Sequence, residues 1–279
     1  MSYGGILIFI YDGSAEGFFS AVFDAFSMKV LPDEVIPEGE EQPSLLKTHY
    51  VETNLEHSSR VRKGIAKKLG GYTLSMIEKA LLFDGEGKET AIMRFVWKAF
   101  KEGRSTGGKI ADEEVNRVFR MCVAVGNEAE RFRQCTRFND VNGALVAEIH
   151  PKHYVLPLIK PFFCARIKNE HFMIFDSEHG AALIHSPEKT AIIPVENLEI
   201  PSDAEDGFYS NLWKSYYRHI AIASRYNPTC RRAHMPKRFW RYLPEMEEEL
   251  SPGYREKLSL GTTAEIAKGL RTEKLMLNG

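Results

Sequence analysis

The stretch ILIFIYDGSAEGFFSAVFDAFSM, residues 6–28, decides how the fold begins. Its first six residues are aliphatic or aromatic and predict a strand over 6–11. A turn at Asp12-Gly13-Ser14 follows, and Phe19, Val22, Phe23 and Phe26 then recur at helical spacing, which predicts a helix over 16–28. The chain therefore opens with a strand that leads directly into an amphipathic helix.

Outward from this stretch, the pattern is mostly helical in the middle and rich in short strands afterwards. Segment 32–43 has few apolar residues and reads as an exposed loop. Asp112 can cap a long helix that runs to about residue 132. The other predicted helices cover 58–69, 74–83, 90–100, 153–165 and 208–225, and the other predicted strands cover 48–53, 135–138, 144–149, 171–175, 181–185 and 191–195.

Strands at both ends of a helical middle, rather than strict alternation of strand and helix, predict an α+β fold. We expect a mixed or antiparallel sheet with helices packed on it. The organisation reads either as one domain over residues 1–246 or as two subdomains, 1–133 and 134–246. Residues 247–279 read as a peripheral acidic tail.

Composition excludes several protein classes. No run of 18 apolar residues is present, so we expect no membrane span. The apolar run 6–10 has neither a basic segment before it nor a small-residue cleavage site after it, unlike a signal peptide. The four cysteines form no Cys-x-x-Cys pair, which favours a reducing compartment over a disulfide framework. We therefore expect a cytoplasmic protein that does not bind membranes.

The charges are unevenly distributed along a chain whose formal net charge is only -1. Residues 1–116 contain 14 Lys and Arg against 18 Asp and Glu. Residues 208–243 contain no Asp or Glu but eight cations. This imbalance predicts a polyanion-binding segment near the C-terminal end.

Aromatic residues alternate with these cations, and both residue types suit nucleic acid. Basic side chains neutralise phosphates, and exposed aromatic faces can stack on unpaired bases. The alternative is an amphipathic surface with aromatic residues in the core and cations facing solvent. The predicted nucleic-acid-binding residues are Arg225, Arg231, Arg232, His234, Lys237, Arg238, Phe239, Trp240 and Arg241, with Phe239 or Trp240 as the stacking rings.

A second basic set, Arg131, Arg133 and Arg137, lies near the end of the long predicted helix. These arginines can line the same groove as the C-terminal segment. Intrahelical salt bridges with Glu128 or Glu130 are an equally simple explanation.

Asp12 and Glu16, at the first strand-to-helix junction, are the candidate catalytic acid and base. Gly13 and Gly17 leave room for a substrate, and a helix N-terminus favours phosphate. The alternative is purely structural, with Asp12 or Ser14 capping the helix and Gly17 allowing close packing.

Histidines and acidic residues also gather between positions 148 and 185, but their spacing matches no metal motif, and we read them as surface residues of a hairpin. Neither a GxGxxG motif nor a P-loop is present. We therefore expect neither a metal site nor another cofactor.

Several motifs, taken in order, resemble a bacterial family of DNA-repair or DNA-metabolism proteins whose domain is otherwise of unknown function. The resemblance covers residues 3–246. The motifs are Tyr11-Asp12-Gly13-Ser14-Ala15-Glu16-Gly17-Phe18, Glu128-Ala129-Glu130-Arg131-Phe132, Arg137-Phe138, His153-Tyr154-Val155-Leu156-Pro157-Leu158, Asn227-Pro228, Arg231-Arg232 and His234-Met235-Pro236-Lys237-Arg238-Phe239-Trp240-Arg241-Tyr242-Leu243.

Members of that family are typically encoded beside a radical-SAM protein related to spore photoproduct lyase, and related domains are fused to uracil-DNA glycosylase-like domains. The resemblance implies a DNA-binding accessory protein in DNA repair or base modification, acting with a radical-SAM partner. It supplies no catalytic residues.

Two other functions stay open, namely a nuclease or glycosylase-like enzyme that uses Asp12 and Glu16, and a scaffold for an acidic protein. The sequence also does not distinguish DNA from RNA.

Overall fold

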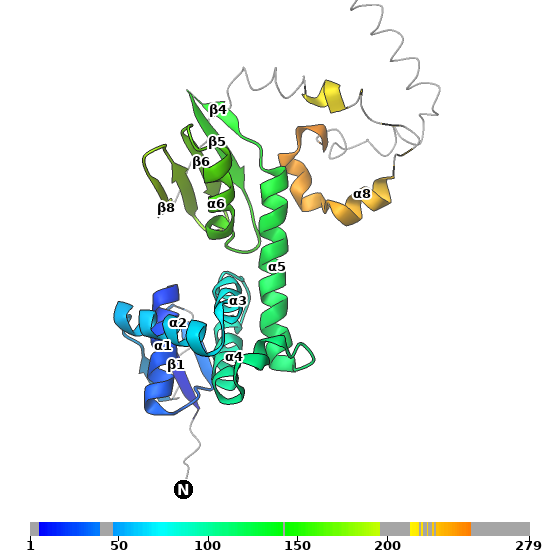
Figure 1. Ribbon diagram of the computed structural model, residues 1–279. Coiled ribbons are helices and arrows are strands. Elements are labelled where there is room, and N and C mark those ends of the chain that lie inside the picture. The colour runs from blue at the N-terminus through cyan, green and yellow to red at the C-terminus, as the bar shows by residue number, and fades with distance from the viewer. Residues whose placement is uncertain are drawn as a thin grey trace, which may run out of the picture. The chain divides into compact units, whose positions relative to one another are not determined.

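The computed structural model describes residues 6–39, 47–141, 143–195, 213–217, 219, 222, 225 and 227–246. The chain divides into two compact units. The first combines Met1–Arg133 with His150–Arg166, and the second combines Gln134–Ile149 with Ile167–Gly279. Helices and two separate sheets make up the described part (Figure 1), which confirms the α+β class.

The first unit contains a three-stranded sheet in the order β2-β1-β3, made of β1 (Leu7–Tyr11), β2 (Glu34–Pro37) and β3 (Lys47–Tyr50). All pairs are parallel, with Phe9 opposite Val35 on one side and His49 on the other. The central strand is buried throughout, as expected for a parallel strand covered on both faces. The expected mixed sheet is present in the second unit, and the sequence did not predict this additional parallel one. Helix α1 (Ala15–Met28) is the crossover that makes β1 and β2 parallel.

Strand β2 lies within the segment predicted to be an exposed loop. Its main chain pairs with β1, and the Val35 side chain is 0% exposed. The Val35 amide also donates to Thr90 Oγ1 at 3.0 Å. The sequence conceals this strand because it is a short edge strand of four residues that ends in a proline and buries only one side chain.

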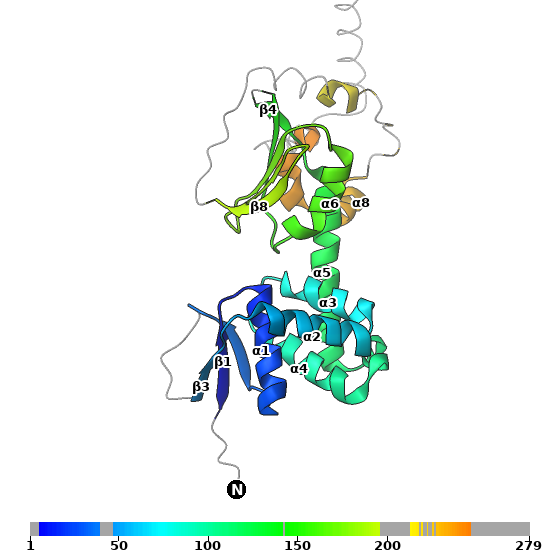
Figure 2. The same cartoon turned by 60° about the vertical axis from the view of Figure 1, so that its left-hand side comes forward.

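Helices complete the first unit, and the cap expected at Asp112 is present. Its Oδ1 accepts a hydrogen bond from the Val115 amide at 3.3 Å. In Figure 2, helix α1 lies against the sheet and α2 lies against α1. The remaining helices are α2 (Leu55–Lys68), α3 (Gly71–Leu81), α4 (Lys88–Glu102), the 3-10 helix η1 (Arg104–Gly108), α5 (Glu113–Cys135) and α6 (Leu156–Arg166).

The second unit contains a five-stranded mixed sheet in the order β4-β5-β6-β7-β8. Only β5 and β6 pair in parallel, and the other neighbours are antiparallel. The strand expected over 135–138 is wrong, because Cys135 still belongs to α5 and the first strand begins at Asn139. The strands are β4 (Asn139–Val141), β5 (Ala144–Ile149), β6 (Phe172–Asp176), β7 (Ala181–His185) and β8 (Thr190–Pro194).

The C-terminal part of the second unit is built from short helices, namely α8 (Pro228–His234), η3 (Lys237–Tyr242) and η4 (Pro244–Met246). Of the helix predicted over 208–225, residues 213–217 and 219 are helical, and most of the others lie outside the described residues. The predicted tail 247–279 lies outside them as well.

Among the residues that the structure describes, no helix combines the length and the apolar composition that crossing a membrane requires.

Phe95 tests the core of the first unit. Its side chain is 0% exposed, so Phe95→Ala should lower the free energy of unfolding by about 3–5 kcal/mol through lost burial and the remaining cavity. Urea denaturation followed by circular dichroism measures this loss. The control is Tyr72→Ala, an exposed ring on α3 whose removal should cost less than about 0.5 kcal/mol. Equal losses in the two variants would contradict the assignment of Phe95 to the core.

Candidate functional site

The first candidate site lies at the end of the parallel sheet where β1 and β3 terminate. Asp12 follows β1, Glu16 is in the first turn of α1, and Thr53 follows β3. The carboxyl ends of parallel strands meet at one edge of a sheet, and β1 has neighbours on both sides there. This position is where open α/β sheets usually bind ligands.

Asp12 is held by three hydrogen bonds from two segments. Its Oδ1 accepts from the Ser14 amide at 2.9 Å and from the Ser14 hydroxyl at 2.6 Å. Its Oδ2 accepts from Thr53 Oγ1 at 2.8 Å. Ser14 in turn caps α1, because its Oγ accepts from the Gly17 amide at 2.9 Å. Asp12 thus connects the end of β1, the start of α1 and the segment after β3.

These hydrogen bonds also determine how Asp12 titrates. Partial desolvation acts to raise its pKa, but the donors on Ser14 and Thr53 outweigh that effect and hold the pKa below the ordinary value of 3.8. The carboxylate therefore stays ionised at neutral pH, which suits a hydrogen-bond acceptor and does not suit a general acid.

Glu16 has different partners. Its Oε1 lies 3.2 Å from Arg62 Nη2, and Arg62 Nη1 lies 3.8 Å from Glu78 Oε1. The same guanidinium covers the ring of Phe19 at 4.6 Å. Both predicted catalytic carboxylates thus reach one edge of the sheet, and each takes part in contacts that a structural role explains. Their acid and base role stays a prediction.

The second candidate site is the basic segment of the second unit. The side chains of Arg225, Arg232, His234, Lys237 and Arg238 are exposed, and that of Arg231 is half-buried. The side chain of Arg241 lies outside the described part. Asn227 starts α8 by accepting a hydrogen bond from the Cys230 amide at 2.9 Å, with Pro228 in the first turn.

Phe239 and Trp240 are buried, with exposed fractions of 1% and 3%. The expectation that they stack on bases is contradicted by this burial. Instead, the Trp240 ring lies 5.4 Å from the guanidinium of Arg231 and 5.8 Å from the ammonium of Lys237. In a 3-10 helix residues i and i+3 share a side, which brings Lys237 over Trp240. The buried Trp240 ring therefore packs against the side chains of Arg231 and Lys237.

The second basic set is engaged in structural contacts. Arg133 bonds Glu130 Oε2 at 3.1 Å, the intrahelical pair that the sequence allowed, and also donates to the Leu158 carbonyl at 2.6 Å. Arg137 lies 3.8 Å from Glu245 Oε1 and 5.9 Å from the ring of Trp213. Arg131 is half-buried.

Sequence reasoning missed the structural role of Glu128. This carboxylate is buried on α5 and accepts from the amides of Lys152 and His153 at 3.1 and 2.8 Å. His153 Nδ1 accepts from the Asp84 amide at 3.2 Å. These bonds attach the segment before α6 to the first unit. The position of Glu128 beside the apolar residues of α5 could have indicated that this carboxylate is buried and hydrogen-bonded.

His179 and His185 of the second unit each bond a neighbour in the same hairpin, and His185 Nε2 also lies 3.2 Å from the Lys168 carbonyl oxygen. The expectation of surface residues is wrong for Asp176 and His185, which are buried. His179 Nδ1 lies 2.8 Å from Asp176 Oδ2, and His185 Nδ1 lies 2.6 Å from Thr190 Oγ1. In the part of the chain that the structure describes, no three His, Cys, Asp or Glu side chains are grouped so as to hold a metal ion.

Gly17 tests the packing at the Asp12 site. A Cβ at this position would clash with Asp12 Oδ1 and would lie 2.9 Å from Thr53 Oγ1. Gly17→Ala should therefore lower the free energy of unfolding by about 1–3 kcal/mol in urea denaturation. The control is Gly64→Ala on α2, where a Cβ meets nothing within 4 Å and a gain of about 0.5–1 kcal/mol is expected. A stable Gly17→Ala variant would contradict the close approach.

The lowered pKa of Asp12 predicts a pH dependence of stability. A carboxylate with a folded-state pKa below its unfolded value stabilises the fold above the unfolded pKa, and this stabilisation is lost as the pH falls through the folded pKa. Asp12→Asn should therefore be less stable than the wild type at neutral pH, and the difference should shrink on acidification below 3.8. Urea denaturation across a pH series checks this. A difference independent of pH would contradict the ionised role of Asp12.

A family described as a domain of unknown function, DUF4130, matches residues 86–245. This region includes Glu128, the second sheet and the basic segment, and it begins after the Asp12 site. No curated protein matches the chain. Because the match covers more than half of the sequence, the chain belongs to the DUF4130 family.

Proposed function

We propose that this protein is a cytoplasmic DNA-binding accessory protein of DNA repair or base modification, which acts with a radical-SAM partner. The observation that carries the DNA-binding part is the exposed row of cations between Arg225 and Arg238, in a segment without acidic residues. The repair setting and the radical-SAM partner rest on the sequence resemblance.

The state of these cations supports phosphate binding. Arg232 and Lys237 are exposed and form no ion pair with any residue in the described part of the chain. Binding would therefore not require breaking an ion pair at either residue. The buried ring of Trp240 limits the freedom of Lys237 and Arg231, which lowers the entropy lost when they contact a phosphate.

The burial of Phe239 and Trp240 changes the expected mode of binding. Without exposed stacking rings at these positions, contacts to the phosphate backbone dominate, and they carry no sequence information. We thus expect the protein to bind the phosphate backbone of DNA with an affinity that falls steeply with salt, and we expect the partner to recognise the lesion.

The test is fluorescence anisotropy of labelled single-stranded and duplex DNA across a salt series. Arg232→Gln/Lys237→Gln should weaken binding to both, and should reduce the slope of log K against log salt by about two, one for each lost phosphate contact. The matched control is Lys168→Gln/Lys189→Gln, which removes two exposed cations from the same unit and should retain most of the slope.

Two results would overturn the proposal. One is absence of DNA binding by the wild type at low salt. The other is equal weakening in the two double variants, because net charge alone would then explain the binding. Circular dichroism of each variant excludes misfolding as the cause.

A further inference from the structure

Helix α2 of the first unit concentrates positive charge in an otherwise acidic region. Residues 1–116 have an excess of acidic residues, yet α2 contains five cations and Glu56 as its single carboxylate. Arg60, Lys63 and Lys67 follow one another at spacings of three and four residues, which puts them on one face of the helix. All three side chains are exposed.

These three cations differ from Arg62 on the same helix. Arg62 bonds both Glu16 and Glu78. Arg60, Lys63 and Lys67 make no ion pair or hydrogen bond through their side chains with the residues described here. The ring of Phe23 lies 5.7 Å from the Arg60 guanidinium, which supports the side chain without neutralising it.

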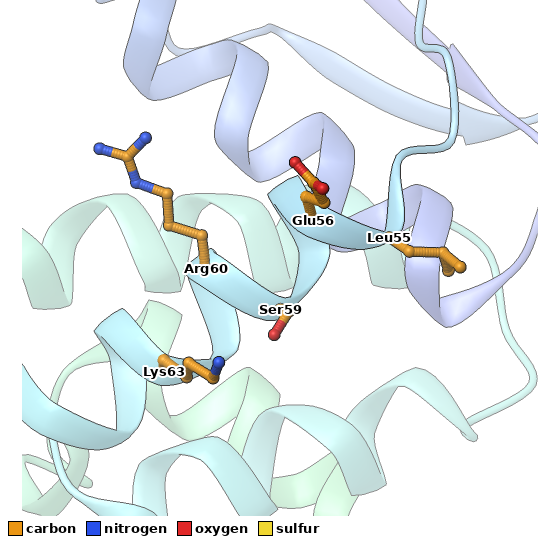
Figure 3. A pocket seen from close by; sticks show the side chains of 5 residues that line it. All are labelled: Leu55, Glu56, Ser59, Arg60 and Lys63. Carbon is orange, nitrogen blue, oxygen red and sulfur yellow. The ribbon is translucent and has the colours of Figure 1, made fainter.

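An open hollow on this face is suited to a sugar–phosphate unit. Leu55, Glu56, Ser59, Arg60 and Lys63 line it, and its volume is about 490 Å³ (Figure 3). The guanidinium of Arg60 extends away from the carboxylate of Glu56 (Figure 3). Leu55 is 71% exposed and offers an apolar contact to a sugar, while the Ser59 hydroxyl offers a hydrogen bond to a phosphate oxygen.

We infer that this face of α2, with Arg60, Lys63 and Lys67, is a second phosphate-contact surface for the backbone of a DNA strand. From Arg60 to Lys67 the helix rises about 10 Å, at about 1.5 Å per residue. A DNA strand has one phosphate about every 3.4 Å along its axis, so about three phosphates cover that length. This inference rests on the proposed function for its ligand, and it assigns a separate site outside the DUF4130 match.

The experiment compares full-length variants in the same anisotropy assay. Arg60→Gln/Lys63→Gln should reduce the salt slope by about two and weaken binding at low salt about tenfold. The matched control is Lys29→Gln/Lys101→Gln, which removes two exposed cations elsewhere in the first unit and should leave most of the slope unchanged. Glu56→Gln should tighten binding, because it removes the one negative charge of the hollow.

The Arg232→Gln/Lys237→Gln variant, titrated beside these, separates the two sites. Loss of slope in that variant alone overturns the α2 surface and leaves the proposed function intact. Loss in the α2 variant alone supports the α2 surface and overturns the C-terminal segment as the DNA site. Equal losses in the α2 variant and its control overturn the inference. Competition by polyglutamate as effective as that of unlabelled DNA also overturns it, because α2 would then recognise acidic chains in general.

Discussion

The first unit depends on the close approach of Gly17 to Asp12 and Thr53. Asp12 accepts hydrogen bonds from Ser14 and Thr53, and a Cβ at position 17 would force both side chains to shift. The bonds connect the central strand, the crossover helix and the segment that leads into α2. Asp12, which the sequence predicts as a catalytic residue, thus also holds together the segments at the end of the parallel sheet. A structural role does not exclude ligand binding at this edge, because ligands of open α/β sheets bind at the carboxyl ends of the strands.

Electrostatics separates the cations into two groups with different roles. Arg62, Arg133 and Arg137 contact carboxylates and pack against neighbouring elements. Arg60 and Lys63 on α2, like Arg232 and Lys237 near the C-terminus, are exposed and form no ion pair with the described residues. A polyanion can bind the second group without displacing a carboxylate partner among the described residues. Total charge hides this division, since residues 1–116 have an excess of acidic residues and still present a basic face on one helix.

Much of the secondary structure could be predicted from the sequence, because local signals suffice where burial is periodic. The apolar run before Asp12 predicts β1, the stripe after Ser14 predicts α1, and Asp112 predicts the start of α5. Strand β2 was not predicted, because its pairing with β1 rather than its own composition makes it a strand. Of the candidate site, the positions of the cations were predictable. The buried state of Phe239 and Trp240 was not, since alternation of aromatic and basic residues fits either surface or core.

The sequence by itself determined the α+β class, the order of most elements and the acid-free segment near the C-terminal end. Each of these follows from composition or from neighbours within a few residues. Only the tertiary structure decided that the first sheet is parallel, that residues 150–166 return to the first unit through Glu128, and which cations are neutralised. The physical reason is that pairing, burial and charge compensation join residues far apart in the chain, and no local pattern specifies the partner.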